Sequence, residues 1–261
     1  MLERHLEILI FEVSFYFIIM KLSSAQISPI KGDIERNIQK HITFIKLAVD
    51  NGANLIFFPE LSLTGYEPTL AKELATTQDD NRLAIFQEIS DTKQIIICVG
   101  MPTQHQNDVC ISMVIFQPNI SRLTYSKQIL HTDEYPYFVN GNQQAYISYK
   151  NHKIAPAICF ESLQIELAEN ASANSANIYL TSVAKSAKGV EKANLHYPKI
   201  AQNLNLIVLM ANSVGPADDF VSTGNSAVWN NEGKMLAQLD NTHEGIIIYD
   251  VESQQFFTHI I

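Results

Sequence analysis

Three side chains that can carry out chemistry each stand directly after a predicted apolar strand. Glu60 follows the run 54–58, Lys127 follows the run 122–126, and Cys159 follows the run 153–158. A strand is a rigid support, and its end can present side chains to a cleft. We therefore take these residues as the first candidates for an active site.

Each of the three has a chemical role that its surroundings favour. Partial desolvation raises the pKa of a carboxylate such as Glu60 and suits it to act as a general base. Lys127, with Glu134 a little further along, can stabilise an oxyanion. Cys159 begins a predicted helix, whose N-terminus lowers a thiol pKa and supplies N–H groups for an oxyanion. Taken singly, Glu60 can equally be a solvated carboxylate and Lys127 an exposed charge.

The segments that must position these residues alternate between short β-rich runs and longer amphipathic runs, which predicts an α/β or mixed α+β layered domain. In 36–49 apolar residues recur every three or four positions, and Asp33 can cap this helix. Further helices are predicted at 83–89, 163–173 and 190–204. Strands are predicted at 22–27, 54–58, 94–99, 109–116, 122–126, 146–149, 153–158, 178–180, 206–210, 226–229, 234–239 and 245–251.

Taken together and in this order, Glu60, Lys127 and Cys159 resemble the Glu-Lys-Cys triad of the nitrilase, or carbon-nitrogen hydrolase, superfamily. The motifs around them are also similar to those of the family, and the resemblance extends from Lys21 to about Val251. The matching blocks are Phe58-Pro59-Glu60 with Gly65-Tyr66, Tyr125-x-Lys127-x-x-Leu130, Glu134 with Phe138 and Gly141, Ile158-Cys159-Phe160-Glu161, Ala211-Asn212-Ser213-Val214-Gly215, and Gly224-Asn225-Ser226 through Gly233.

The resemblance implies a fold and a reaction. The fold is a four-layer α-β-β-α sandwich in a single domain, paired into homodimers or higher oligomers. The reaction is cleavage of a non-peptide C–N bond in a small amide or nitrile: Cys159 is the nucleophile, Glu60 the base, Lys127 the oxyanion stabiliser, and Glu134 orients Lys127. The residues expected to contact the substrate are Tyr66, Phe138, Phe160, Ser182, Val183 and Lys185.

Two departures from the family pattern leave the substrate open. Many members carry an Arg-aromatic-Pro-Glu run after the nucleophile, whereas this chain has Leu163-Gln164-Ile165-Glu166. Where members commonly show Arg-Ala-x-Glu-Asn, this chain has Ile200-Ala201-Gln202-Asn203-Leu204. An N-acyltransferase using the same triad and a non-catalytic binding module on the same scaffold remain alternatives. A papain-like pair of Cys159 and His196 would leave Glu60 and Lys127 without a role.

The composition of the chain limits the classes of molecule that it is expected to bind. With 18 Lys and Arg against 27 Asp and Glu, the net charge of −9 argues against nucleic acid and anionic membranes and favours a small molecule. Three cysteines are too few for a disulfide scaffold, which predicts a reducing, cytoplasmic setting. Of these, Cys98 and Cys110 lie inside predicted strands and are expected to be inert. No histidine cluster or Gly-rich loop predicts a metal or nucleotide cofactor.

The N-terminal segment 6–20 is strongly apolar but only fifteen residues long, and it contains Glu7 and Glu12. A membrane span needs about 20 residues with few charges, so we do not expect this segment to cross a bilayer. We expect Met20 to be the natural start, residues 1–19 to be an extension outside the core, 20–252 to form the hydrolase domain, and 253–261 to be a tail.

Overall fold

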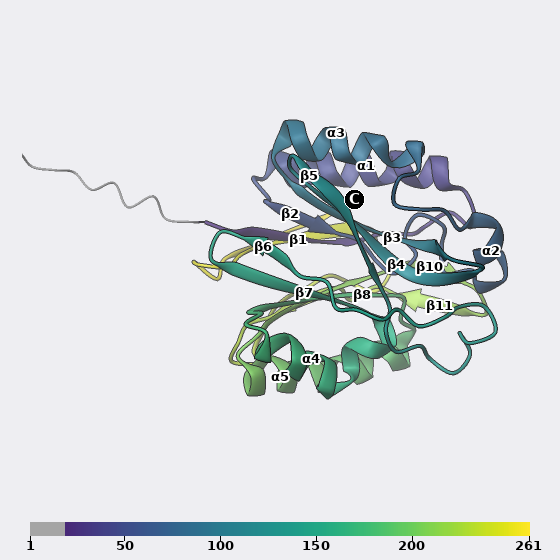
Figure 1. The fold of residues 1–261 in the computed structure, drawn as a ribbon. Coiled ribbons are helices and arrows are strands. Elements are labelled where there is room, and N and C mark those ends of the chain that lie inside the picture. Colours follow the sequence, from purple (N-terminus) through teal and green to yellow (C-terminus); the bar gives the residue numbers. More distant parts are fainter. Residues whose placement is uncertain (1–18) are drawn as a thin grey trace, which may run out of the picture.

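The computed structural model describes residues 19–261, which form two facing β-sheets covered on their outer sides by helices (Figure 1). One sheet has seven strands in the order β15-β14-β1-β2-β3-β4-β5, and the other has six in the order β13-β12-β9-β8-β7-β6. Helices α1 (Ile34–Asp50) and α3 (Ala84–Lys93) lie on the first sheet, and α4 (Ile165–Ala173) and α5 (Ala187–Leu204) on the second. The predicted four-layer α-β-β-α sandwich in a single domain is confirmed.

The remaining elements have the following bounds. The first sheet contains β1 (Lys21–Gln26), β2 (Leu55–Phe57), β3 (Ile96–His105), β4 (Asp108–Gln117), β5 (Ile120–Ser126), β14 (Gly245–Asp250) and β15 (Phe256–Ile260). The second contains β6 (Ile147–Tyr149), β7 (His152–Ile158), β8 (Ile178–Val183), β9 (Ile207–Asn212), β12 (Ala227–Trp229) and β13 (Met235–Gln238). A two-stranded ribbon is made of β10 (Val214–Ala217) and β11 (Phe220–Thr223), and the short helices are η1 (Pro68–Leu70), α2 (Ala71–Leu74), η2 (Asn81–Leu83) and η3 (Cys159–Leu163).

The strand directions bring several strand ends to one edge of the sandwich. In the first sheet β2 runs parallel to β3, and β5 has the same direction because it is antiparallel to β4, which is antiparallel to β3. In the second sheet β7, β8 and β9 are all parallel. The carboxyl ends of neighbouring parallel strands meet at one sheet edge, the usual place for a binding site in such sheets.

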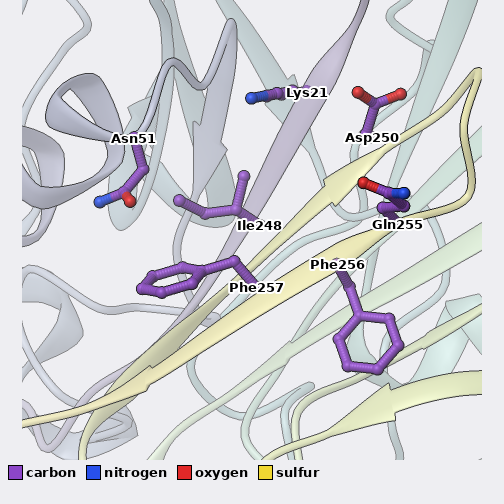
Figure 2. A pocket seen from close by; sticks show the side chains of 7 residues that line it. All are labelled: Lys21, Asn51, Ile248, Asp250, Gln255, Phe256 and Phe257. Carbon is purple, nitrogen blue, oxygen red and sulfur yellow. The ribbon is translucent and has the colours of Figure 1, made fainter.

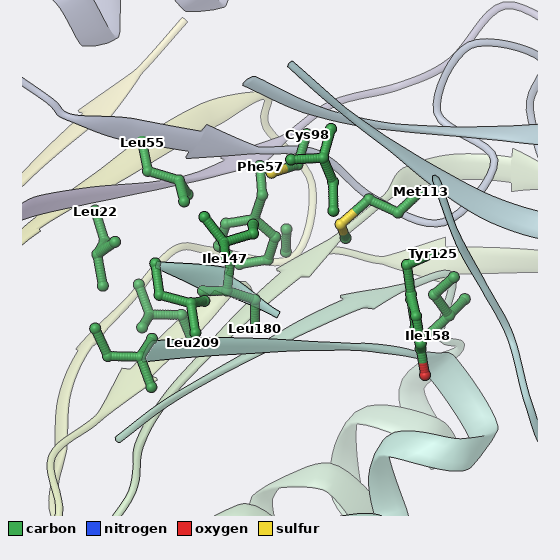
Figure 3. Close-up of a cluster of buried hydrophobic side chains, with 14 of the residues drawn as sticks. Leu22, Leu55, Phe57, Cys98, Met113, Tyr125, Ile147, Ile158, Leu180 and Leu209 are labelled. Atoms are coloured by element: carbon green, nitrogen blue, oxygen red, sulfur yellow. The ribbon is translucent and has the colours of Figure 1, made fainter. Parts of the chain in front are cut away.

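The space between the sheets is filled by aliphatic and aromatic side chains from both (Figure 3). Leu22, Leu55 and Phe57 project from the first sheet, and Leu180 and Leu209 project from the second. Successive side chains of a strand point to opposite faces of the sheet, so every second one enters the central core and the others face the helical layers. This apolar packing makes the frame around the site rigid.

Helix α1 forms where the sequence predicted it. Asp33 accepts a hydrogen bond from the backbone N–H of Arg36 at 3.0 Å, which caps the helix. Ile34, Ile38 and Ile45 are among the side chains on the buried face, which packs on the first sheet. The periodicity of apolar residues therefore places the helix and chooses its inner face.

Three strands of the structure were not predicted, β10 and β11 of the ribbon and β15, and one prediction lies outside the described residues. β10 and β11 were not predicted, because Gly215 and Pro216 interrupt the alternation that marks a strand. Residues 253–261, expected to be a tail, contain β15, which pairs antiparallel with β14 and extends the sheet. The expected N-terminal extension falls almost wholly on residues 1–18, outside the described residues, while Met20 is buried in the core.

The hairpin of β14 and β15 borders a cavity of about 210 Å³ (Figure 2). It contains one lysine and one carboxylate but no cysteine or histidine, and we assign no chemistry to it. It is lined by Lys21, Asn51, Ile248, Asp250, Gln255, Phe256 and Phe257. Within residues 19–261, the helices lack the combination of length and apolar character that a bilayer span requires.

A buried histidine connects α1 to the loop after β2. His41 Nδ1 donates to the Asn37 carbonyl at 2.7 Å, and its Nε2 lies 2.9 Å from the Ser62 hydroxyl. The Ser62 hydroxyl in turn accepts the N–H of Gly100 at 3.1 Å. Burial lowers the pKa of His41 to about 3, partly offset by its bond to Asn37 and reinforced by Lys40. The ring is therefore neutral when the protein is folded.

This depressed pKa makes stability depend on pH. Below the ordinary pKa of about 6.5, the unfolded chain binds a proton at His41 that the folded chain does not, so stability falls by about 1.4 kcal/mol per pH unit. We expect His41→Gln to lose less stability than wild type between about pH 7 and pH 5 in urea unfolding. Exposed His105→Gln should keep the wild-type dependence. Identical pH slopes in wild type and His41→Gln would contradict the assignment.

Candidate active site

Glu60 lies in a tight loop after β2 that packs against β3. The next residue, Leu61, has a φ of 51°, in the left-handed region that non-glycine residues rarely adopt. A Cβ on Gly100 of β3 would lie 2.5 Å from both the Leu61 nitrogen and the Pro59 carbonyl oxygen. Only glycine allows the loop to come this close, so Gly100 sets the position of the Glu60 backbone.

Lys127 directly follows β5, and its backbone is held from both sides. Its N–H donates to the Ile111 carbonyl at 2.8 Å, and its carbonyl accepts the N–H of Gly141 at 2.7 Å. A Cβ on Gly141 would collide with the carbonyl of Ser126. Gly141 therefore lets its segment approach the Lys127 backbone closely, as Gly100 does for the Glu60 loop.

Cys159 stands at the turn between β7 and η3, with a φ of 49°. This left-handed conformation is strained for a cysteine, and such strain is characteristic of functional positions that the surrounding structure holds in place. The turn aims the sulfur away from the strand and toward the carbonyl of Ala184, which lies 3.8 Å away.

Glu161, which sequence reasoning left without a role, joins the turn to the lysine segment. One carboxylate oxygen accepts the N–H of Ile158 at 2.8 Å and the Tyr125 hydroxyl at 2.7 Å. The other accepts the N–H groups of Gln128 at 2.6 Å and Ile129 at 3.1 Å. This fully buried carboxylate therefore ties together the two segments, one from each sheet, that carry Cys159 and Lys127. Its position two residues after the cysteine was the only available signal.

The charged side chains meet in a buried cluster. Lys127 Nζ donates to Glu60 Oε1 at 2.8 Å and to Glu134 Oε1 at 2.6 Å, and all three side chains are shielded from solvent. Tyr66 donates to the same Glu134 oxygen at 2.9 Å, and the N–H of His131 donates to the other at 2.7 Å. Among residues 19–261, the second oxygen of Glu60 is buried without a hydrogen-bond partner, so it is free to accept a proton.

Burial controls the protonation of this cluster. It raises the pKa of Glu60, although the Lys127 charge acts in the opposite direction. Burial alone would lower the pKa of Lys127, but the charges of Glu60, Cys159 and Glu134 raise it above its usual value. Burial and then Glu60 raise the pKa of Cys159 to about 11, against the influence of Lys185 and Lys127. The prediction that a helix N-terminus lowers the thiol pKa is therefore wrong, because η3 spans only five residues and desolvation dominates.

A cavity of about 550 Å³ opens onto Cys159 and Glu134, within the usual range for small-molecule sites. Of the expected substrate contacts, Tyr66, Phe160 and Lys185 line it. Phe138 packs in the core between the sheets, Val183 packs beneath the helices of the second sheet, and Ser182 donates to the Phe58 carbonyl at 2.8 Å. These three side chains are therefore not among the residues that line the cavity.

Sequence reasoning did not identify several residues of this cavity. They lie in loops, at the end of η3, at the start of β11 and in α5, where no apolar pattern marks a side chain as facing a cavity. The additional lining residues are His131, Asp133, Leu163, Gln164, Ala184, Ser186, Gly189, Lys192, His196 and Phe220.

Comparisons with known proteins agree with the fold and give the family. The family model for carbon-nitrogen hydrolases matches residues 21–256, and the chain therefore belongs to the carbon-nitrogen hydrolase family and is an enzyme of that class. An amidase from Nesterenkonia sp. AN1, solved in complex with butyramide, superposes with a TM-score of 0.82 at 21% identity, covering 90% of this chain and 92% of that one. At this level of sequence identity, the similarity between the two structures shows only that they share a fold.

Two curated relatives illustrate the range of the family. A glutamine-dependent NAD(+) synthetase from Acinetobacter baylyi is 26% identical over 247 residues, covering 90% of this chain but 45% of that protein. A probable nitrilase from Schizosaccharomyces pombe is 22% identical over 239 residues, covering 88% of each chain. The chain thus spans less than half of the synthetase.

The close approach at Gly141 can be tested directly. Gly141→Ala adds a methyl group against the Ser126 carbonyl, and relieving the clash must displace the Lys127 backbone. Overpacking of this kind costs about 1–3 kcal/mol of stability, and we expect turnover to fall about tenfold or more. The matched control is Asn140→Ala at the exposed neighbouring position. Urea unfolding and steady-state rates that are equal in the two variants would contradict this role.

Proposed function

We propose that this carbon-nitrogen hydrolase cleaves the C–N bond of a small carboxamide through a thioester on Cys159. The observation that supports the proposal most strongly is the buried Glu60–Lys127–Glu134 cluster, held beside a cysteine at the mouth of a cavity. Burying three charges costs stability, and such a cluster is therefore expected where a function depends on it. The free, buried oxygen of Glu60 is the proton acceptor that such a reaction requires.

The first step transfers a proton and forms the covalent bond. Glu60 accepts the thiol proton of Cys159, and the sulfur electron pair attacks the carbonyl carbon of the amide. A carboxylate with a raised pKa is a stronger base near neutral pH than an exposed one, which offsets the raised pKa of the thiol. The carbonyl oxygen becomes an oxyanion.

Two donors are available to that oxyanion. The Lys127 ammonium is held by Glu60 and Glu134, and the backbone N–H of Phe160 follows the nucleophile in the sequence. Preorganised donors of this type are each worth on the order of 3 kcal/mol in the transition state. Because Glu134 also accepts from Tyr66 and from the His131 N–H, it orients Lys127.

The remaining steps return the enzyme to its starting state. The tetrahedral intermediate collapses, the C–N bond breaks, and Glu60 gives its proton to the departing nitrogen, releasing ammonia or an amine. A water molecule then attacks the thioester while Glu60 takes one of its protons. The C–S bond breaks, the acid leaves, and Glu60 gives that proton to the sulfur, so the same residue acts as base and then as acid in each half of the cycle.

The amide of glutamine is a second candidate substrate, because four curated relatives at 25–28% identity are glutamine-dependent NAD(+) synthetases. This chain covers 41–46% of each of them. Acyl transfer to an amine uses the same thioester, and a binding module would keep only the cavity. A homodimer and a cytoplasmic location stay predictions.

Variants of the cluster test the proposal. We expect Cys159→Ala and Glu60→Gln to lower turnover by about a thousandfold or more, because residues that act as one unit fail together. Lys127→Met should lower both turnover and stability, since two buried carboxylates lose their partner. Cys110→Ala is the matched control, because it removes a thiol outside the cavity. Ammonia release from short aliphatic amides, glutamine and nitriles is the readout, with circular dichroism to verify folding.

Each other outcome has a defined meaning. A variant that retains wild-type turnover removes that residue from the mechanism. Acyl-amine product formed in preference to free acid when an amine is added would favour the acyltransferase. Failure of the wild type to release ammonia, acid or acyl-amine from any compound would contradict the proposed hydrolase and favour a binding module.

A further inference from the structure

A second lysine, outside the Glu-Lys-Cys triad, is built into the site. Lys185 follows β8 and is only 5% exposed. Its N–H donates to Asn212 Oδ1 at 2.8 Å, and its carbonyl accepts the Asn212 amide at 3.1 Å and the N–H of Thr223 at 3.0 Å. The buried Asn212 side chain therefore clamps the Lys185 backbone from both sides, and burial leaves the Lys185 side chain less free to move than a surface lysine.

The ammonium of Lys185 is directed at the nucleophile. Its Nζ lies 3.8 Å from Cys159 Sγ, within hydrogen-bond range for sulfur. Within residues 19–261, no carboxylate forms an ion pair with Lys185. Its ammonium donates a hydrogen bond to the Cys159 sulfur instead. A buried ammonium without a directly paired anion is costly, and a negative charge formed on the sulfur would offset that cost. Gly189 leaves room for the stem, since a Cβ there would lie 3.0 Å from Lys185 Cβ.

Glu60 and Glu134 carry two negative charges against the one positive charge of Lys127, and Lys185 supplies a second positive charge beside them. With the thiol protonated, the anions Glu60 and Glu134 face the cations Lys127 and Lys185. When the proton moves from Cys159 to Glu60, the anions become the sulfur and Glu134, and the sum is unchanged. The negative charge leaves an oxygen that Lys127 contacts and arrives at a sulfur that Lys185 contacts. Each position of the proton thus has its own cation.

The other titratable groups near Lys185 leave this pairing intact. Tyr197 of α5 approaches from the helical layer, and burial keeps its pKa above the usual value, so its hydroxyl is neutral. Glu60 and Lys127 approach from the first sheet, and Lys192 and His196 border the cavity on the open side. Among the acids, Glu134 contacts Lys127, and Asp133 lies at the mouth of the cavity beside His131.

We propose that Lys185 is a fourth catalytic residue, whose ammonium stabilises the negative charge on the Cys159 sulfur while Glu60 holds the thiol proton. The proposal rests on the thioester mechanism above. The S–H bond breaks, an O–H bond forms on Glu60, and the electron pair remains on the sulfur that faces Lys185 until the C–S bond forms. The same charge reappears when hydrolysis breaks the thioester, so Lys185 acts in both halves of the cycle.

Alkylation of Cys159 by iodoacetamide tests this role without knowledge of the substrate, because the neutral, small reagent reports the reactivity of the sulfur alone. Rates would be measured from about pH 5 to pH 10 by peptide mass mapping, in wild type, Lys185→Met, Lys185→Arg and the control Lys188→Met. Lys188 is exposed and three positions away, so its variant changes the net charge equally. We expect Lys185→Met to slow labelling about tenfold at neutral pH and to move the midpoint up by about one pH unit.

Rescue and folding variants complete the test. Lys185→Arg should recover part of the rate because it keeps the charge, and Lys188→Met should match wild type. If Lys185→Met does not give the wild-type circular dichroism spectrum, Lys185→Gln is used in its place. The expected result is the same, because the glutamine side chain is polar but carries no charge. These readouts stand even if no amide is turned over, which separates failure of this proposal from failure of the proposed function.

A wild-type pH profile of Cys159 alkylation in folded Lys185→Met or Lys185→Gln would overturn the proposal. If these variants also showed a raised KM for amides that carry a carboxylate and an unchanged KM for neutral amides, Lys185 would instead be a ligand for the substrate anion.

Discussion

The site depends on a lysine ammonium buried away from water between two carboxylates. Lys127 lies 2.8 Å from Glu60 and 2.6 Å from Glu134, and each carboxylate without it would be an unpaired buried charge. Burial raises the pKa of Glu60 even though the Lys127 charge opposes the rise, and the two carboxylates keep the lysine charged. The thiol beside them therefore meets a base that is strong enough to take its proton.

The sandwich makes this cluster possible because it brings strand ends from two sheets to one place. β2 and β5 deliver Glu60 and Lys127 from the first sheet, while β7 and β8 deliver Cys159 and Lys185 from the second. The apolar side chains between the sheets hold the layers together, and Glu161 joins the cysteine turn to the lysine segment across them. The precision of the site thus arises from rigid elements and a few buried polar ties.

The sequence predicted the layers and the clustered residues well, because both leave strong local signals. The apolar period of α1 and the runs before Glu60 and Cys159 can be read from the chain. The cavity wall was predicted less well: Ser182 and Val183 were expected to face substrate, but their orientation depends on how β8 packs. The raised thiol pKa depends on desolvation, and the clamp on Lys185 depends on Asn212, which is distant in the sequence. Contacts of this kind have no local pattern.

The most direct test of the central claim is mass spectrometry of the enzyme during turnover of a small amide, quenched with acid within milliseconds to seconds. The account predicts an adduct with the mass of the acyl group on the peptide that contains Cys159, formed before free acid appears and absent from Cys159→Ala. Steady release of ammonia and acid without any such adduct, or an adduct on another residue, would contradict a thioester on Cys159 and with it the role assigned to the buried cluster.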